Sequence, residues 1–434
     1  MFPSDPAIDF VAPPFAGHLF PALDLARRLR DRGFSKLRVL TTAGGRAAVE
    51  ASRLPFVEIL PGQDDAVRAI ANTRVAVGSS PLRMWRQVRS NLALMRDLQQ
   101  QLRDAWIHQR PDLVLADFVV PVAGLTAQSM GIAWWSGMPS PCALETPDGT
   151  PAYLGGWSPR PGLVGKIRDW AGRRAVRTFK KASAWLFRHQ LEPLGIDGLY
   201  REDGTEVIYS PERILAYGLQ EFEFHRRWPD AVRFIGPLTA PPPLTGLASK
   251  PSEGEVPGGD IRKPGQPEWI AERPTVLVTL GTHLWWAKER AITLLEDVAR
   301  RMPDTEFHFS RGEMRSNRAE RRGNLTLCDS IPYGPELRRY AAAIIHGGTG
   351  ITYACVESAV PMLVWPHDYD QFDHAARVVH HGLGRRLVPS AGRIVKDLRE
   401  LMPDVAVRAS LQRFQAQTSG SDPVARVTEL LRQG

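Results

Sequence analysis

The chain has 434 residues, of which 43% are hydrophobic and 24% are charged, and its formal net charge is +8. This length predicts two domains, and no stretch reaches the roughly 20 apolar residues of a membrane-spanning helix. Three widely separated cysteines (Cys142, Cys328 and Cys355) exclude a disulfide framework and show no metal-ligand spacing. The amino-terminal sequence lacks the pattern of a secretory signal, so we expect a cytosolic protein.

The first half of the sequence alternates between strand and helix patterns, which is typical of an α/β domain. Helices are predicted over residues 20–32, where Gly33 ends the pattern, and over residues 81–109. Pro and Gly are frequent in residues 139–161, which predicts a loop. Short apolar runs predict strands at residues 8–12, 37–42, 113–116, 131–135 and 214–217. We expect this domain to cover residues 1–236.

Residues 165–190 carry eight Lys or Arg side chains and one acidic residue, Asp169. Apolar residues, including Trp170 and Trp185, recur in this run at helical spacing. A basic amphipathic helix with tryptophans can lie on an anionic membrane surface. Such a stripe is also the normal mark of a helix that packs on its own domain, and this interpretation is favoured. Nothing in the run resembles a nucleic-acid-binding module.

The composition changes between Pro237 and Pro274, where Pro, Gly, Ser and charged residues dominate. Such a segment predicts a linker over residues 237–274. Strand and helix patterns resume at Val276 and predict a second domain over residues 275–410. Residues 411–434 predict a terminal helix with a break near Gly420.

The most informative segment of the second half runs from Ala341 to Gln371. It predicts a buried strand, a turn containing His346 and paired glycines, a helix, a second strand, and then a polar Asp370-Gln371 pair. Small residues between a strand and a helix leave backbone N–H groups bare at the positive end of the helix, which suits a phosphate. The polar pair follows the next strand and so lies at the same edge of the sheet, where open α/β folds bind ligands.

This segment resembles the donor-binding half of the family 1 nucleotide-sugar glycosyltransferases, which have two Rossmann-like domains. The matching runs are His346-Gly347-Gly348-Thr349-Gly350, Val360-Pro361, Pro366 to Gln371, and His374 to Val378. The likeness is greatest to the bacterial antibiotic and glycolipid branch, covers nearly the whole chain, and is weak between about Leu60 and Tyr200. It implies an α/β fold with two Rossmann-like domains facing a cleft, and a C-terminal helix that crosses back to the first domain.

Two residues of the first domain match the catalytic pair of the resembled family. His18, in the run Gly17 to Pro21, follows the first strand, and Asp117 ends the strand that begins at Leu113. Both are expected at the carboxyl edge of one sheet. The resemblance implies that His18 removes the acceptor proton while Asp117 orients and stabilises the imidazole. Asp112 precedes the same strand and is expected at the opposite edge.

The second domain is expected to hold the nucleotide sugar. Gly281 and Thr282 follow its first strand, and the resemblance implies a phosphate cradle without metal and hydrogen bonds from Asp370-Gln371 to the sugar. No D-x-D pair in a metal-binding context follows a strand, so metal-independent catalysis is predicted. The expected donor-binding residues are Gly281, Thr282, Ser330, His346, Gly348, Thr349, Gly350, Asp370 and Gln371.

Two departures from the family pattern leave uridine or thymidine open as the base of the donor. Ala354 stands where plant-type relatives have a ribose-binding glutamate, and Ser330 stands where an aromatic ring often stacks on the base. Aromatic residues around the loop at 139–161 can line an apolar acceptor pocket or cover the sheet. The candidates for the acceptor pocket are Trp135, Met138 and Trp157.

The sequence therefore predicts inverting transfer of a hexose from a UDP- or dTDP-sugar to a hydroxyl of an apolar natural product or lipid. Alternatives are a nucleotide-sugar epimerase, because one fold hosts several activities, and a non-catalytic partner that activates a transferase. Retention of both His18 and Asp117 argues against the partner. Oligomeric state is left open.

Overall fold

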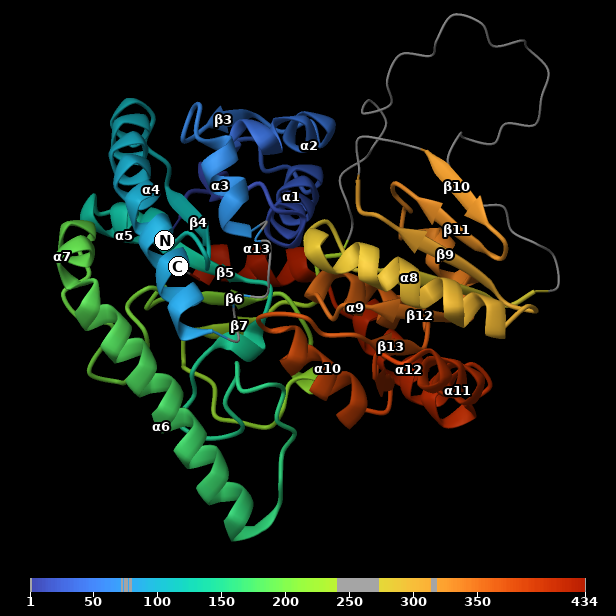
Figure 1. Cartoon of the computed structure of the whole chain (residues 1–434). Coiled ribbons are helices and arrows are strands. Elements are labelled where there is room, and N and C mark those ends of the chain that lie inside the picture. The colour runs from blue at the N-terminus through green and yellow to red at the C-terminus, as the bar shows by residue number, and fades with distance from the viewer. Residues whose placement is uncertain are drawn as a thin grey trace, which may run out of the picture. The chain divides into compact units, whose positions relative to one another are not determined.

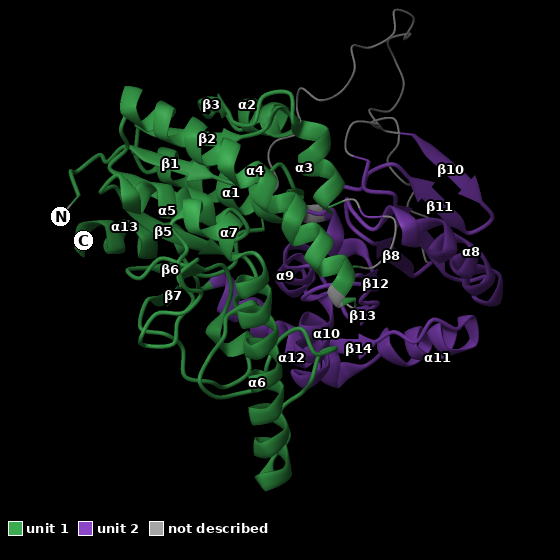
Figure 2. Cartoon of the chain, turned by 60° about the vertical axis from the view of Figure 1, so that its left-hand side comes forward, with its two compact units in different colours: residues 1–71, 77–242, 420–434 green, residues 72–76, 243–419 purple. Residues whose placement is uncertain are grey.

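The computed structural model describes residues 2–71, 73, 77, 80–239, 273–313 and 318–433. Contacts divide the chain into two compact units, shown in Figure 2. Unit 1 comprises residues 1–71, 77–242 and 420–434, and unit 2 comprises residues 72–76 and 243–419. Most of the predicted linker, residues 240–272, lies outside the described residues.

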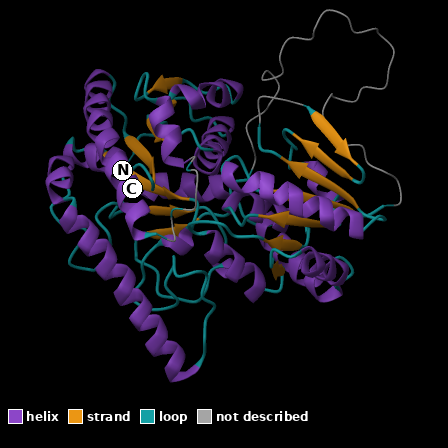
Figure 3. Cartoon of the chain, viewed as in Figure 1, coloured by secondary structure: helices purple, strands orange, loops and turns teal. Residues whose placement is uncertain are grey.

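Unit 1 contains a seven-stranded parallel sheet in the order β3-β2-β1-β4-β5-β6-β7. Helices cover it on both sides (Figures 1 and 3). The strands are β1 (Ile8–Val11), β2 (Leu37–Thr41), β3 (Phe56–Glu58), β4 (Leu113–Asp117), β5 (Ala133–Met138), β6 (Ile214–Ala216) and β7 (Val232–Phe234). The helices are α1 (Ala16–Asp31), α2 (Arg46–Ala51), α3 (Asp64–Ala71), α4 (Pro81–His108), α5 (Pro121–Ser129), α6 (Gly162–Leu186), α7 (Arg188–Leu191) and α13 (Pro423–Gln433).

Side chains alternate between two cores in unit 1, as the period of a strand requires. Leu113 and Leu115 of β4 belong to the core beneath α1 and α13, whereas Val114 and Ala116 belong to the core beneath α4 and α5. Asp117 continues the first set, so its side chain leaves the sheet on the side of α1. Strand alternation therefore positions Asp117 beside the helix that carries His18.

Unit 2 also contains a seven-stranded sheet, in the order β10-β11-β9-β8-β12-β13-β14. All its pairs are parallel except β10 with β11. The strands are β8 (Thr275–Thr279), β9 (Glu306–Ser310), β10 (Ala319–Arg322), β11 (Leu325–Cys328), β12 (Ala342–Ile345), β13 (Met362–Val364) and β14 (Gly384–Arg386). The helices are α8 (Trp285–Arg301), α9 (Thr349–Glu357), α10 (Gln371–His380), α11 (Ala391–Leu401) and α12 (Val405–Ser419).

The predicted fold class, α/β with two Rossmann-like domains, is confirmed by these sheets and by the structural comparisons given below. The C-terminal segment differs in detail from the expectation of one terminal helix. It forms two helices separated at Gly420: α12 packs on α9 within unit 2, and only α13 contacts α1 of unit 1. Gly420 separates them because glycine weakens a helix interior.

Helix α1 begins earlier than the sequence predicts. The expected start at Phe20 would have placed Pro21 in the first turn, where proline is tolerated. The structure starts the helix at Ala16 and keeps Pro21 inside it. His18 therefore lies in the first turn of α1 rather than in the loop that precedes the helix.

Candidate active site

His18 and Asp117 meet at the carboxyl edge of the unit 1 sheet, as predicted. Nδ1 of His18 lies 3.0 Å from Oδ1 and 3.1 Å from Oδ2 of Asp117. Strands β1 and β4 are neighbours, with connections that leave to opposite sides of the sheet, and ligands of open α/β sheets bind at such a switch point. Asp112, by contrast, accepts a hydrogen bond from the backbone N–H of Ala7 at the start of the same strands.

The surroundings of this pair fix its geometry. Oδ1 of Asp117 also accepts the backbone N–H of Val119 at 3.0 Å, and the Asp117 side chain is only 5% exposed. The His18 ring lies 5.5 Å from the ring of Phe118, centre to centre, and its side chain is 24% exposed. Because Nδ1 is the ring nitrogen that contacts the carboxylate, Nε2 is the nitrogen that a general-base role would require.

Tyr217 is a buried neighbour that the sequence did not single out. Its pKa is raised by burial and, to a smaller extent, by the negative charge of Asp117. Gly137, the register partner of Asp117, leaves room for this phenol, since a Cβ there would lie 2.3 Å from its oxygen. Tyr217 thus adds a neutral hydroxyl to the surroundings of the carboxylate.

The corresponding switch point of unit 2 lies between β8 and β12, and it brings Gly281 and His346 together. A Cβ at Gly281 would lie 2.9 Å from Cε1 of His346, and a Cβ at Gly348 would lie 2.5 Å from its Nε2. The imidazole is therefore enclosed by two glycine turns. Gly281 also needs to be glycine for its backbone angle, φ of +73°.

Burial lowers the pKa of His346 to about 4, and the nearby His367 contributes further in the same direction. The backbone of Thr279 and the carboxylate of Asp370 oppose this shift only in part. His346 is therefore a neutral imidazole at neutral pH, which offers a hydrogen bond rather than a positive charge.

The beginning of α9 adjoins this histidine. Gly348 is its N-cap residue, and Thr349 and Gly350 form its first turn. The first backbone N–H groups of a helix have no partner within the helix, and the helix dipole makes this end positive. The arrangement suits an anion, as the sequence predicts, and a Cβ at Gly350 would meet nothing within 4 Å.

Thr349, His374 and Asp370 form a connected polar group. The Thr349 hydroxyl lies 3.1 Å from Nε2 of His374, and the same nitrogen lies 3.6 Å from Oδ2 of Asp370. His374 is buried, whereas the Asp370 side chain is 24% exposed. His374, which the sequence showed only as part of a family motif, thus connects the glycine turn to the residues expected to bind the sugar.

Gln371 is placed differently from Asp370. Its Oε1 accepts the backbone N–H groups of His367 and Asp368, at 2.9 and 3.1 Å. The Oε1 atom therefore holds the loop that follows β13, so a hydrogen bond from Gln371 to a sugar would have to come from its amide nitrogen.

The remaining predicted donor residues lie at the same sheet edge. Thr282 follows Gly281, and Ser330 follows β11 by two residues. The Tyr333 hydroxyl lies 2.8 Å from that of Thr279 at the end of β8. Among the described residues, no group of three or more His, Cys, Asp or Glu side chains is arranged to hold a metal ion.

The structure does not support the residues expected to line the acceptor pocket. Trp135 is buried in the core, where its ring packs edge-to-face on that of Phe2 with centres 5.9 Å apart, and Met138 is fully buried. Core burial leaves these side chains no surface for an acceptor. Trp157 is partly buried and packs against α6 at Gly172, where a Cβ would lie 2.8 Å from its ring.

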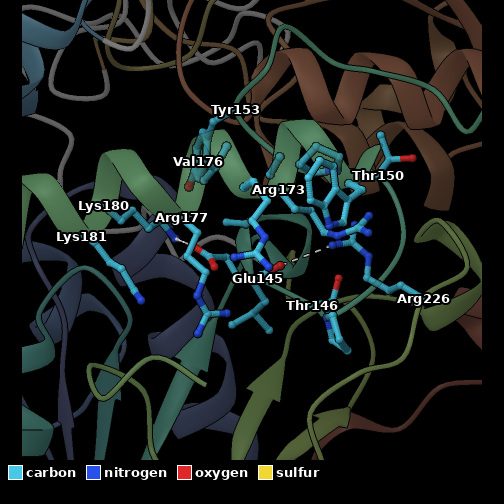
Figure 4. A pocket seen from close by; sticks show the side chains of 17 residues that line it. Glu145, Thr146, Thr150, Tyr153, Arg173, Val176, Arg177, Lys180, Lys181 and Arg226 are labelled. Carbon is cyan, nitrogen blue, oxygen red and sulfur yellow. Dashed lines mark hydrogen bonds and ion pairs between the residues drawn. The ribbon is translucent and has the colours of Figure 1, made fainter. Parts of the chain in front are cut away.

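A cavity of about 450 Å³ does adjoin the predicted loop after β5 (Figure 4). It is bounded by residues 143–147 and 150–153 of this loop, by one face of α6 and by Arg226, all within unit 1. We call it the α6 cavity. Its lining contains Leu144, Tyr153, Trp170 and several basic side chains.

Comparisons with known proteins agree with this geometry. Residues 301–431 match the family described as "Erythromycin biosynthesis protein CIII-like, C-terminal domain". The chain is 28% identical to the elloramycin glycosyltransferase ElmGT of Streptomyces olivaceus, over 96% of this chain and 95% of the relative. It is 22% identical to the zeaxanthin glucosyltransferase of Pantoea ananas, over 93% and 90% of the two chains. The crystal structure of the kitacinnamycin glycosyltransferase superposes with a TM-score of 0.69 at 22% identity and covers 99% of both chains.

The two Rossmann-like units, together with the similarity to these relatives, indicate a nucleotide-sugar-dependent glycosyltransferase of the two-domain type. The chain is similar to family 1 of these enzymes, and most of all to the bacterial branch that includes antibiotic glycosyltransferases.

Proposed function

We propose that this enzyme transfers a hexose from a UDP- or dTDP-sugar to a hydroxyl of an apolar small molecule, with inversion at the anomeric carbon and without metal. The observation that carries the proposal is the 3.0 Å contact between His18 and Asp117 at the unit 1 switch point. A hydroxyl nucleophile is activated when a general base removes its proton. An imidazole beside a buried carboxylate suits this role.

The proposed step is a direct displacement. Nε2 of His18 takes the proton of the acceptor hydroxyl, and the oxygen forms a bond to the anomeric carbon on the face opposite the leaving group. The bond from that carbon to the phosphate oxygen breaks, and the nucleoside diphosphate leaves with the electron pair. Asp117 stabilises the imidazolium formed by proton transfer, because an adjacent opposite charge favours the charged form of a histidine.

On the donor side, the developing diphosphate charge is met by hydrogen-bond donors rather than by a bound cation. The first N–H groups of α9, the Thr282 hydroxyl and the neutral His346 imidazole serve this purpose. Asp370 and the amide nitrogen of Gln371 bind the sugar hydroxyls. This assignment follows from their position beside the glycine turn.

The test is a product analysis with α-linked UDP- and dTDP-sugars and a panel of hydroxylated apolar acceptors. We expect β-linked glycosides by NMR, equal rates with and without EDTA, and no epimerised nucleotide sugar. Retention of the anomeric configuration would refute direct displacement. Release of an epimerised sugar or of free nucleotide without acceptor would favour the epimerase alternative.

We also infer that this enzyme works at an anionic membrane surface, through the outer face of α6. This face exposes Leu163, Val164, Ile167, Trp170, Trp185 and Leu186, with Leu163 72% and Trp185 67% exposed. The favoured expectation that the apolar stripe packs on its own domain is therefore wrong for these residues. Helix α6 projects from the rest of unit 1 in two views (Figures 1 and 2).

The charges of this face complement anionic lipid. Lys166 is exposed on it, and Arg174 and Lys181 are exposed where it borders the α6 cavity, which they also line, while Asp169, the single acidic residue of α6, is buried. Exposed apolar and basic side chains together characterise a helix that lies in a membrane interface. Two copies of the face would bring like charges together, which disfavours a dimer. No helix among the described residues is long and apolar enough to cross a membrane.

Sedimentation with phosphatidylglycerol vesicles tests the surface. We expect binding that weakens in high salt, little binding to phosphatidylcholine, and loss of binding in Ile167→Glu/Trp185→Glu. Val405→Glu, which changes another exposed apolar residue in unit 2, is the control. Salt-independent self-association that Ile167→Glu abolishes would show instead that a second copy covers this face.

A further inference from the structure

The α6 cavity is positively charged, which an apolar acceptor does not require. Six basic side chains line it, against one acidic side chain, Glu145. The six are Arg173, Arg174, Arg177, Lys180, Lys181 and Arg226. Figure 4 shows Arg173, Arg177 and Lys180 on α6 above the loop that carries Glu145 and Thr146.

Two of these cations are neutralised within the protein. Lys180 lies 2.9 Å from Glu145 and 3.0 Å from Glu206, and these carboxylates raise its pKa despite its burial. Arg226 lies 3.6 Å from Glu223. These two side chains therefore hold the cavity wall through ion pairs and add no net positive charge to the cavity.

The other four form no ion pair with any residue that the structure describes. Arg173 donates to the carbonyl of Gly149, and Arg177 lies over the ring of Tyr200 at 3.9 Å while donating to the carbonyl of Gly204. A guanidinium has five N–H donors, so each retains donors for a ligand. The held guanidinium groups give the cavity fixed positive charge, which Asp148 near Arg173 and Glu206 near Arg177 offset only in part.

The wall opposite α6 is fixed as well. Gly165 and Gly172 lie two turns apart on the buried side of α6, and a Cβ at either would collide with the loop, at 1.9 Å from the carbonyl oxygen of Arg160 and 2.8 Å from Pro151. Arg168 donates to the carbonyl of Ser158 at 2.8 Å. The expected flexible loop is thus packed closely on the helix.

Packed side chains of the unit 1 core connect the cavity to the catalytic pair. Phe118, whose ring contacts that of His18, packs on a cluster that includes Leu144, and Leu144 lines the cavity. Both sites lie at the carboxyl ends of neighbouring strands, since Asp117 of β4 pairs with Gly137 of β5. The cavity and the catalytic pair are thus joined by packed side chains at one edge of the unit 1 sheet.

We propose that the acceptor is a hydroxylated apolar molecule that carries an anionic group, a carboxylate or a phosphate, which the α6 cavity binds through Arg173 and Arg177. This inference rests on the proposed glycosyl transfer and specifies its acceptor. Leu144, Tyr153 and Val176 provide the apolar part of the site, and charge-assisted bonds to guanidinium provide its selectivity.

The test uses a panel of hydroxyaromatic carboxylic acids such as 6-hydroxy-2-naphthoic acid, each with its methyl ester and the matching phosphate monoester. We expect kcat/KM for the acid or the phosphate to exceed that for the ester by about tenfold or more. The better of the two anions identifies the group. Arg173→Gln/Arg177→Gln should remove this preference by lowering kcat/KM for the anion to about the value for the ester.

Two further variants separate the role of the cavity from a general effect on the helix or its loops. Lys166→Gln removes a charge from the exposed side of the same helix and should leave the preference unchanged. Because Arg173 and Arg177 also hold neighbouring loops, Arg174→Gln/Lys181→Gln, which changes cavity residues without such hydrogen bonds to the described loops, is a second variant and is expected to weaken the preference. If no anion in the panel exceeds its ester in the wild type, the proposal is overturned, while turnover of esters by His18 keeps the proposed function.

Discussion

The two switch points of this protein share a topology and differ in chemistry. In unit 1, the edge between β1 and β4 holds an imidazole against a buried carboxylate. In unit 2, the edge between β8 and β12 holds an imidazole between glycines, with its pKa lowered to about 4. A carboxylate partner prepares His18 to become a cation, whereas burial keeps His346 neutral. We therefore expect the same residue type to serve as a base in one unit and as a hydrogen-bonding group in the other.

Removal of the unit 1 imidazole should give the largest effect. His18→Ala is expected to lower kcat by about 10²- to 10⁴-fold, the usual contribution of a general base. Binding of the nucleoside diphosphate, measured by calorimetry, should remain unchanged because its residues lie in unit 2. A variant with normal turnover would exclude His18 as the base.

The carboxylate can be tested with a matched control on the same strand. Asp117→Asn should lower kcat by about 10²-fold or more, since the imidazolium loses its partner. Asp112→Asn alters an exposed carboxylate at the opposite end of β4 and should leave kcat unchanged. Equal losses in the two variants would indicate a general effect on folding rather than catalysis.

The glycine turn of unit 2 should be the next most sensitive feature. Gly348→Ala places a methyl group 2.5 Å from Nε2 of His346, so either the ring or the turn must move. We expect an increase of about tenfold or more in the Kd of the nucleoside diphosphate, because oriented donors lose their positions. Gly350→Ala, where the added methyl meets nothing within 4 Å, should have little effect. Similar Kd values for both variants would contradict the cradle.

The positions of His18, Asp117 and His346 could be predicted because strand ends and sheet order determine them. A residue that follows an apolar strand lies at the carboxyl edge of a parallel sheet, whatever packs around it. The prediction that Trp135 and Met138 line the acceptor pocket does not match their burial, for a related reason. Both lie in a strand, and which face of a strand is buried depends on helices that are distant in sequence. The run Ala133 to Met138 alone does not show that α/β layers cover both faces.

The contact between Thr349 and His374 could not be predicted from the sequence either, because a side-chain hydrogen bond joins residues 25 positions apart. The exposure of α6 was misjudged because its apolar and basic residues are mixed around the helix. The pattern showed an amphipathic helix but not which residues face the domain. The glycines at 165 and 172 were the available signal, because close packing at two turns' spacing marks the buried side.

Donor binding is expected to depend on pH because the pKa of His346 is lowered in the free enzyme. Its pKa of about 4 lies below the ordinary value of 6.5, so protonation is disfavoured in the free enzyme. A bound diphosphate favours the imidazolium and raises the pKa of this group. Affinity should therefore rise as the pH falls from about 6.5 toward 4, by at most about tenfold per pH unit for one proton.

His346→Gln tests this dependence against the titration of the diphosphate itself. The variant should retain only the pH dependence that the ligand contributes, as measured by calorimetry in buffers of different ionisation enthalpy. An unchanged slope would assign the proton uptake to another group. The same lowered pKa predicts that His346 lowers the stability of unit 2 as the pH falls from 6.5 to 4, since the unfolded chain binds this proton first.

The smallest expected effect concerns the connection between the glycine turn and the sugar-binding end of the site. Thr349→Val keeps the shape of the side chain but removes the hydroxyl that bonds Nε2 of His374, the nitrogen that also faces Asp370. Loss of one such bond costs about 0.5–1.5 kcal/mol, so we expect the KM of the nucleotide sugar to rise roughly two- to tenfold, while the Kd of the free nucleoside diphosphate changes less. Thr352→Val, one turn further along α9, removes a hydroxyl that bonds only the carbonyl of Gly348 in the structure. A rise in KM in both variants alike would mean that α9 as a whole was disturbed, whereas a rise confined to Thr349→Val would show that the glycine turn positions Asp370 for the sugar through His374.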